Sequence, residues 1–478
     1  MKKLLIGVFT LLFVNQIKAQ DIAGSWQGGI TISGTTLHVI FNIKKTDTGY
    51  TTTFDSPDQK VFGIACSKTY KVKDSVFIEI ALIKGGYKGL WDGKDGITGV
   101  YRQGGGHIAL DMKRVTDADK AALTKDPMRP QTPKPPYSYA SEDVEYDNAD
   151  KSLHYGATFT KPKGDGKYPA VIIISGSGTQ DRDGSMMGHK PYWVLADYLT
   201  KNGIAVLRVD DRGTGKSSLG KDISSATSAD FSYDVEASLN YLETRNDVDK
   251  KHLGLIGHSE GGIIAPMVAA RRKDVNFIVL WGAPIIGGAR IQTEQQGDGI
   301  KEMGVDSVAV DAYKSLNLQI LDQFASSPGK DVLDQKIVTI FDAWKKAQSP
   351  KVLNTLWPNG AITAQQLSVG YNKLYDTAWW HFFIVYDPAT DLSKVKCGVL
   401  AVNGSKDTQV KAKTNLAAIK EILTKSGNKH FEVKELPGLN HLLQTANTGA
   451  VSEYEKIDET MSPEAMKIIS DWIKIHTK

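Results

Sequence analysis

Three residues whose types together perform acyl transfer follow three separate apolar runs in the second half of the chain. Ser259 lies within "GHSEGG" (257–262), after the run "HLGLI", and Asp407 follows "GVLAVNG". His441 lies in "LPGLNH", after the run "HFEVKE". A serine hydroxyl becomes a nucleophile when a histidine removes its proton and an acid orients that histidine. These three residues are therefore candidates for a catalytic triad.

Other acids and histidines compete for two of these roles. Asp387 and Asp391 precede the strand-like run at 398–404, so they belong to the opposite end of that strand from Asp407. Of the four histidines that follow the serine, only His441 comes after a predicted strand and in a loop; the others are His381, His430 and His476. The chain order is then nucleophile, acid and base, with each residue just past the carboxyl end of a strand.

A tetrahedral intermediate also needs backbone N–H groups that stabilise its oxyanion. One candidate donor is Glu260, the residue after the serine. The second is expected in the loop "SGSGTQDRDG" (175–184), where the N–H of Ser177 or of Gly176 is the candidate. The glycines of this loop let a backbone approach a ligand closely. A simple glycine-rich turn is the alternative interpretation.

The elements that must position these residues follow an alternating pattern after residue 137. "YPAVIIIS", "GIAVLRVD", "HLGLIGH" and "VNFIVLW" are near-continuous apolar runs, separated by helical stretches such as 189–202 and 229–245. Such runs are typical of strands buried on both faces of a parallel sheet. Residues 137–478 are therefore predicted to form an α/β domain with a doubly wound, mostly parallel sheet.

Two segments modify this pattern. An antiparallel pair of strands is expected at 142–162, before the parallel strands. Residues 285–390 interrupt the alternation with mixed helical segments and several tryptophans. We interpret this interruption as a helical cap inserted over one end of the sheet, the end where functional sites of such sheets lie.

The front of the chain has a different character. Residues 20–115 contain short β-branched or alternating runs separated by Gly, Asp and Ser clusters, which predicts a small all-β domain, a barrel or a sandwich. The proline-rich residues 116–136 are predicted to be a linker.

The first twenty residues are typical of a secretory signal. Lys2 and Lys3 precede an apolar run from Leu4 to Val14, and Ala19 suits the residue before cleavage. Residues 1–19 are therefore predicted to be a signal peptide, and the protein to be secreted or periplasmic. The apolar run is shorter than the roughly 20 residues of a spanning helix, so no stable membrane insertion is expected.

Charge and cysteine content exclude several other classes. The formal net charge of +4 is too small to indicate a nucleic-acid partner. Cys66 and Cys397 fall in different predicted domains, so no disulfide framework is expected. No His and Cys cluster has the spacing of a zinc site, and no metal or organic cofactor is predicted.

Five of these stretches resemble motifs of the α/β-hydrolase superfamily. "SGSGTQDRDG", "DDRGTGKS", "GHSEGG", "NGSKDTQV" and "LPGLNH" are similar to its oxyanion loop, post-strand turn, nucleophile turn, acid loop and histidine loop. The likeness is greatest to a bacterial serine esterase branch grouped with serine aminopeptidase-like hydrolases. One departure is Ser175, where relatives often have histidine. The front domain is similar to a β domain that precedes secreted hydrolases of this kind, and its ligand is not predicted.

The expected function is that of a secreted serine hydrolase. The resemblance implies that it cleaves small carboxylic esters through an acyl-enzyme on Ser259, with Asp407 and His441 completing the triad. A peptidase of the same fold is the second interpretation. A catalytically idle protein that binds glycan or lipid is a third, which the presence of all three triad residue types disfavours.

Overall fold

The chain is described by a computed structural model that divides into two compact units, Met1–Asp126 and Pro127–Lys478. The structure describes residues 21–32, 35–59, 61–103, 106–124, 129–220, 223–357 and 362–477. The predicted signal peptide at 1–19 lies outside these residues. Among the helices that are described, none is both long and apolar enough to cross a membrane.

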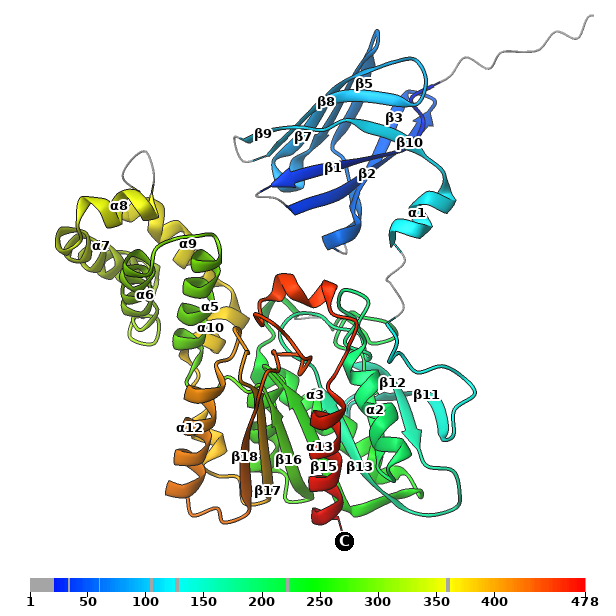
Figure 1. Cartoon of the computed structure of the whole chain (residues 1–478), viewed down its shortest axis with the longest axis vertical. Helices are drawn as coiled ribbons and strands as arrows, with labels where there is room; N and C mark the ends of the chain where they lie inside the picture. The colour runs from blue at the N-terminus through cyan, green and yellow to red at the C-terminus, as the bar shows by residue number, and fades with distance from the viewer. Residues whose placement is uncertain are drawn as a thin grey trace, which may run out of the picture. The chain divides into compact units, whose positions relative to one another are not determined.

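The first unit is one antiparallel sheet that curls into a half-barrel (Figure 1). The sheet order is β4-β3-β2-β1-β10-β8-β7-β6-β5, and β9 pairs with β8. The curl brings the two ends of this order together, since the hydroxyl of Thr69 in β5 donates to the hydroxyl of Thr52 in β3 at 2.8 Å. Trp26, Phe41 and Tyr87 are buried inside it. Of the two predicted architectures, the structure therefore has the barrel-like one. The elements are β1 Gly24–Ile32, β2 Thr35–Thr46, β3 Gly49–Ser56, η1 Pro57–Gln59, β4 Val61–Ala65, β5 Lys68–Val72, β6 Ser75–Ile80, η2 Ala81–Ile83, β7 Gly85–Trp91, β8 Gly96–Gln103, β9 Gly106–Ala109 and β10 Met112–Val115.

The segment predicted as a linker, 116–136, is structured in two parts. Its first part contains the helix α1, Asp117–Thr124. In its second part the buried guanidinium of Arg129 donates to the carbonyl oxygens of Met187 at 2.8 Å and Glu455 at 2.7 Å. A proline-rich composition does not show such contacts, because they depend on carbonyl groups far away in the sequence. The residues from 129 onward thus belong to the second unit.

The second unit contains a mixed sheet in the order β11-β12-β14-β13-β15-β16-β17-β18. The first two strands run antiparallel, and the six from β14 to β18 are parallel. The predicted doubly wound, mostly parallel sheet is confirmed. The strands are β11 Ala140–Asp147, β12 His154–Lys161, β13 Tyr168–Ile174, β14 Ala205–Val209, β15 Val248–His258, β16 Val275–Trp281, β17 Gly398–Gly404 and β18 Phe431–Leu436.

Helices cover both faces of this sheet. The helices α2 (Pro191–Lys201) and α13 (Pro463–His476) pack on one face; the other carries α3 (Ser228–Thr244), α4 (Gly261–Arg271) and α12 (Ala412–Lys425). Neighbouring residues of one strand therefore enter different cores, as the isoleucines of β13 do. This is why the strands are apolar throughout and do not alternate with polar residues.

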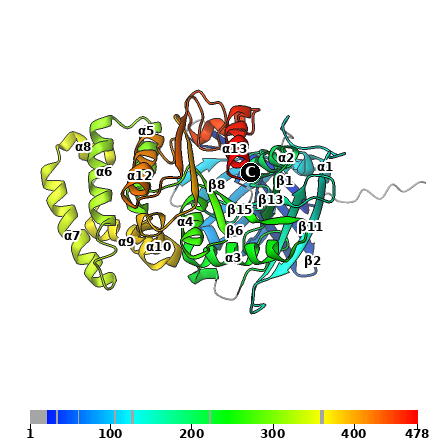
Figure 2. The ribbon, with the colours of Figure 1, turned by 90° about the horizontal axis from the view of Figure 1, so that it is seen from below.

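A helical insertion between β16 and β17 forms the cap. It has a core of its own, built around Phe324, Phe341 and Trp344. Figures 1 and 2 both show α6 to α9 as a group at one side of the sheet. The cap helices are α5 Gly288–Glu302, α6 Ser307–Leu321, α7 Lys330–Ala347, α8 Pro350–Leu356, α9 Ala364–Asp376, α10 Ala378–Val385 and α11 Ala389–Leu392; two short 3₁₀ helices elsewhere in the unit are η3 Ile223–Ser225 and η4 Val451–Lys456.

Candidate active site

Ser259 occupies a strained turn between strand β15 and helix α4. Its φ angle is 52°, in the left-handed region that side chains other than glycine rarely adopt. Such a conformation costs on the order of 1–3 kcal/mol and persists where the surrounding structure enforces it. Here the N–H of Ser259 donates to the carbonyl oxygen of Trp281 at 2.8 Å. The turn is also tight: a Cβ atom at Gly257 would lie 2.0 Å from the carbonyl oxygen of Gly261.

Asp407 and His441 form a buried pair beyond the carboxyl ends of β17 and β18, which are neighbours in the sheet. Nδ1 of His441 lies 2.7 Å from Oδ2 of Asp407, and the side chains are 4% and 0% exposed. The second carboxylate oxygen accepts the N–H groups of Gln409 at 2.9 Å and Val410 at 2.8 Å. A neutral imidazole that donates from Nδ1 to a carboxylate keeps its Nε2 lone pair free to accept a proton. The pair can therefore act as a general base.

The serine and the histidine line the same cavity, which has a volume of about 650 Å³. Gly282, after strand β16, has a φ angle of 59° and lies against this pair. A Cβ atom at this glycine would lie 3.0 Å from the His441 ring and 3.5 Å from Oδ2 of Asp407. A larger residue would therefore displace the imidazole from its acid.

The competing acids lie elsewhere. The carboxylate of Asp387 accepts the N–H of Ala389, and that of Asp391 accepts the hydroxyl of Tyr386. Both precede strand β17, and neither lines the cavity. Their side chains satisfy local turn and helix groups and do not reach His441.

The loop after β13 runs beside the serine. A Cβ atom at Gly176 would lie 3.0 Å from Cβ of Ser259. The N–H of Gly176 already donates to the hydroxyl of Tyr192 at 3.2 Å. Within the described part of the chain, the N–H groups of Ser177 and Glu260 have no hydrogen-bond partner. Of the two loop candidates, the geometry favours Ser177 as the oxyanion donor.

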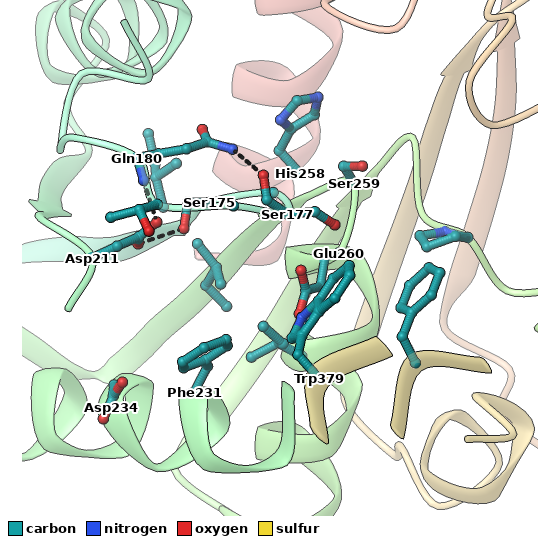
Figure 3. A pocket seen from close by; sticks show the side chains of 18 of the residues that line it. Ser175, Ser177, Gln180, Asp211, Phe231, Asp234, His258, Ser259, Glu260 and Trp379 are labelled. Atoms are coloured by element: carbon teal, nitrogen blue, oxygen red, sulfur yellow. Dashed lines mark hydrogen bonds between the residues drawn. The ribbon is translucent and has the colours of Figure 1, made fainter. Parts of the chain in front are cut away.

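An acid that the sequence analysis did not single out supports this loop. Oδ1 of Asp211 accepts the hydroxyl of Ser175 at 2.6 Å, and Oδ2 accepts the N–H of Gln180 at 2.8 Å, as Figure 3 shows. Desolvation of the carboxyl raises the pKa of Asp211 to about 7. The available sequence signal was the second acid of "DDRGTG", after strand β14, which could equally be a solvated turn residue.

The side chain of Glu260 links the nucleophile turn to the cap. Its Oε1 atom accepts the hydroxyl of Ser228 and the indole N–H of Trp379, each at 2.7 Å. Figure 3 shows the side chains of Glu260 and Trp379 side by side. Burial raises the pKa of the Glu260 carboxyl. Trp379 belongs to the cap helix α10, so this hydrogen bond joins the cap to the residue that follows the serine.

A second histidine lies next to the candidate base. His258 is buried, its Nδ1 atom lies 2.9 Å from the hydroxyl of Tyr192, and its ring centroid is 4.8 Å from that of His441. Burial lowers the pKa of His258 well below its usual value. The ring is neutral as a result and does not oppose a positive charge on His441.

The remainder of the cavity lining is mainly apolar, with its charges paired. Arg212 in the lining pairs with Asp234 at 2.7 Å. No group of three or more metal-ligating side chains occurs in the described ranges. The apolar side chains that line the cavity include Phe231, Ile264, Trp379, Trp380 and Phe383. This lining suits a neutral acyl group more than a charged one.

Sequence comparison gives related proteins. A family model described as "Serine aminopeptidase, S33" matches residues 187–301, which include Ser259. The chain is 24% identical to esterase EstD of Thermotoga maritima over 286 residues, 59% of this chain and 57% of that esterase. The chain belongs to the α/β-hydrolase superfamily.

One further relative and one solved structure extend the comparison. This α/β-hydrolase is 26% identical over 147 residues to the uncharacterized protein YfhR of Escherichia coli O157:H7, 30% of this chain and 48% of YfhR. It therefore spans about half the length of the curated relatives that it matches. Among solved structures, the α/β hydrolase GrgF from Penicillium sp. sh18 overlaps with 70% of this chain and 99% of its own, at 15% identity and a TM-score of 0.42.

Proposed function

We propose that this α/β-hydrolase is a serine hydrolase that cleaves carboxylic esters through an acyl-enzyme on Ser259. One observation carries the proposal: a serine in a left-handed turn lines the same cavity as a histidine that is bonded to a buried acid. In this proposal the strained backbone conformation of Ser259 presents its hydroxyl at the end of strand β15.

The proposed reaction has two halves. His441 accepts the hydroxyl proton at Nε2 while Ser259 Oγ attacks the acyl carbon, and the carboxylate of Asp407 stabilises the imidazolium. The N–H groups of Ser177 and Glu260 donate to the oxyanion. His441 then passes the proton to the departing alcohol oxygen. In the second half it deprotonates a water molecule, which attacks the acyl carbon. His441 then returns this proton to Oγ of Ser259 as the bond from Oγ to the acyl carbon breaks and the carboxylic acid leaves.

Two observations favour a neutral ester over a peptide with a free amino terminus. An aminopeptidase site needs an acid that is available to the substrate ammonium group. The carboxyl groups that line the cavity already accept hydrogen bonds from protein groups; they are those of Asp210, Asp211, Asp234 and Glu260. One related protein, EstD, carries the name of an esterase.

A substrate panel tests this assignment. We expect p-nitrophenyl esters of short and medium acyl chains to be hydrolysed, with kcat/KM at least a hundredfold above that for aminoacyl p-nitroanilides. The reverse order would establish the peptidase alternative. Absence of turnover on both series, together with no reaction with a fluorophosphonate, would favour a binding protein without catalysis.

We also propose that the enzyme is exported and that residues 1–19 are removed. The support is the pattern of Lys2, Lys3 and the apolar run Leu4 to Val14. Amino-terminal sequencing of the protein recovered from the medium or periplasm should give a chain that begins at residue 20. Recovery of the full chain in the cytoplasm would contradict this proposal.

A further inference from the structure

We propose that Asp211 is a positioning residue that holds the oxyanion loop against Ser259, an inference that rests on the proposed function. The carboxyl bonds the two ends of one short segment, the hydroxyl of Ser175 at 2.6 Å and the N–H of Gln180 at 2.8 Å. Between these ends lies Ser177, whose N–H is the proposed donor. Asp211 follows strand β14, which is the sheet neighbour of the strand that leads into the loop.

A third hydrogen bond joins the same two loops in the opposite direction. The N–H of Asp211 donates to the carbonyl oxygen of Gln180 at 3.1 Å, so backbone and side chain both join the two loops. The hydroxyl of Ser175 and the carboxyl of Asp211 thus hold the first end of this segment.

The charged groups around Asp211 indicate that its carboxyl holds the loop by hydrogen bonds and not by a negative charge. No cationic side chain among the described residues forms an ion pair with Asp211. The nearby charged groups that affect it are two acids, Glu260 and Asp234, and the adjacent Arg212 is turned toward Asp234. With desolvation these acids favour the protonated form of Asp211.

A protonated carboxyl keeps both loop contacts. One oxygen still accepts the N–H of Gln180, while the O–H donates to the hydroxyl oxygen of Ser175. An asparagine amide has the same donor and acceptor arrangement. The proposal therefore distinguishes two variants: Asp211→Asn retains both bonds, and Asp211→Ala removes both.

Steady-state kinetics on one p-nitrophenyl ester tests the proposal. Because loss of an oxyanion donor costs roughly 10²–10³ in kcat, we expect Asp211→Ala to lower kcat by about ten- to a hundredfold, with KM within about threefold. Asp211→Asn should stay within about threefold of wild type. Ser175→Ala should lower kcat less than Asp211→Ala does, and Ser175→Ala combined with Asp211→Ala should equal Asp211→Ala alone, because both remove the same bond.

A second readout separates this inference from the choice of substrate. The rate of fluorophosphonate labelling should fall in the same order, since it reports on the nucleophile and oxyanion site of any serine hydrolase. Asp387→Ala, outside the cavity, is the control, and circular dichroism reports folding.

If Asp211→Ala does not fold, Ser175→Ala alone decides, with a loss in kcat of at least fivefold expected. Unchanged kcat in the folded alanine variant, or a loss in Asp211→Asn as large as in Asp211→Ala, would overturn the proposal. Lack of ester turnover by wild type would contradict the proposed function while the labelling rates still test the loop.

Discussion

The indole Nε1–H of Trp281 donates a hydrogen bond of 2.9 Å to the carbonyl oxygen of His441. The carbonyl oxygen of the same tryptophan accepts the N–H of Ser259 at 2.8 Å. Trp281, buried at the end of β16, thus bonds the backbone of both the proposed nucleophile, Ser259, and the proposed base, His441. This backbone bond does not orient the ring of His441. The hydrogen bond between that ring and Asp407 does.

We therefore predict that Asp407→Asn lowers kcat on an activated ester by on the order of 10³–10⁴, because an amide does not hold the productive imidazole tautomer. Stopped-flow or steady-state kinetics would measure the loss. Asp387→Asn and Asp391→Asn are matched controls of the same chemistry, and both should stay within about threefold of wild type. A collapse in either control with little change in Asp407→Asn would assign the acid to another loop.

Trp379 should determine which acyl chains fit. Trp379→Ala removes an indole from the cavity lining, and we expect the ratio of kcat/KM for octanoate over butyrate esters to rise by roughly tenfold. Trp379→Phe keeps a ring but removes the donor to Glu260, so its chain-length ratio should stay near that of wild type. An unchanged ratio in Trp379→Ala would show that the acyl group lies elsewhere.

The domain boundary for a shortened enzyme follows from Arg129 and Gln131. All described residues that line the cavity belong to the second unit, so a chain starting at Pro127 should keep kcat within about threefold on a small ester. A chain starting at Tyr137 lacks the hydrogen bonds of Arg129 and of Gln131, which bonds the backbone of Met461. At about 1 kcal/mol for each of these four bonds, we expect its free energy of unfolding to fall by roughly 4 kcal/mol.

Thermal unfolding of the two shortened chains gives this comparison directly. Equal Tm values would mean that residues 127–136 contribute nothing to the second unit. A folded chain from Pro127 that loses more than about tenfold in kcat, roughly 1.4 kcal/mol of barrier, would instead show that the β unit contributes to the site.

The raised pKa of Asp211 predicts a pH-dependent effect on stability. In the folded state this pKa is about 7, above its usual value of 3.8, so ionisation is disfavoured by folding. The contribution of Asp211 is therefore most favourable below pH 4 and is lost as pH rises through 7. Asp211→Asn has no such ionisation and should be more stable than wild type at pH 8, with a smaller difference at pH 5. Urea unfolding at the two pH values measures both differences, and a gap that widens toward low pH would contradict the raised pKa.

Much of the second unit could be predicted because its signals are local. An apolar run followed by a polar loop identifies both a buried strand and the edge where its side chains act, which is how Ser259, Asp407 and His441 were selected. The structure adds the hydrogen bond between the last two. The glycine-rich character of 175–184 likewise identified the loop but left two N–H candidates.

The supports of the site could not be predicted, because each depends on where a side chain points. The strands β13 and β14 are consecutive in the chain and adjacent in the sheet, but a loop acid after β14 could equally face solvent, and the sequence does not show that Asp211 contacts Ser175. Trp379 contacts Glu260 across the cap, 119 residues away in the chain. The second half of the predicted linker was similarly misjudged from composition, since the carbonyl groups that bind Arg129 are remote in sequence.

The nucleophile assignment is tested most directly by labelling with a fluorophosphonate probe followed by peptide mass spectrometry. We predict one modified residue, Ser259, in wild type, and loss of both labelling and ester hydrolysis in folded Ser259→Ala, with kcat reduced by on the order of 10⁵–10⁶. Ser177→Ala is the matched control, because it removes a hydroxyl in the same cavity and keeps the backbone N–H; it should still be labelled. Labelling or turnover that persists in Ser259→Ala would contradict the assignment of Ser259 as the nucleophile.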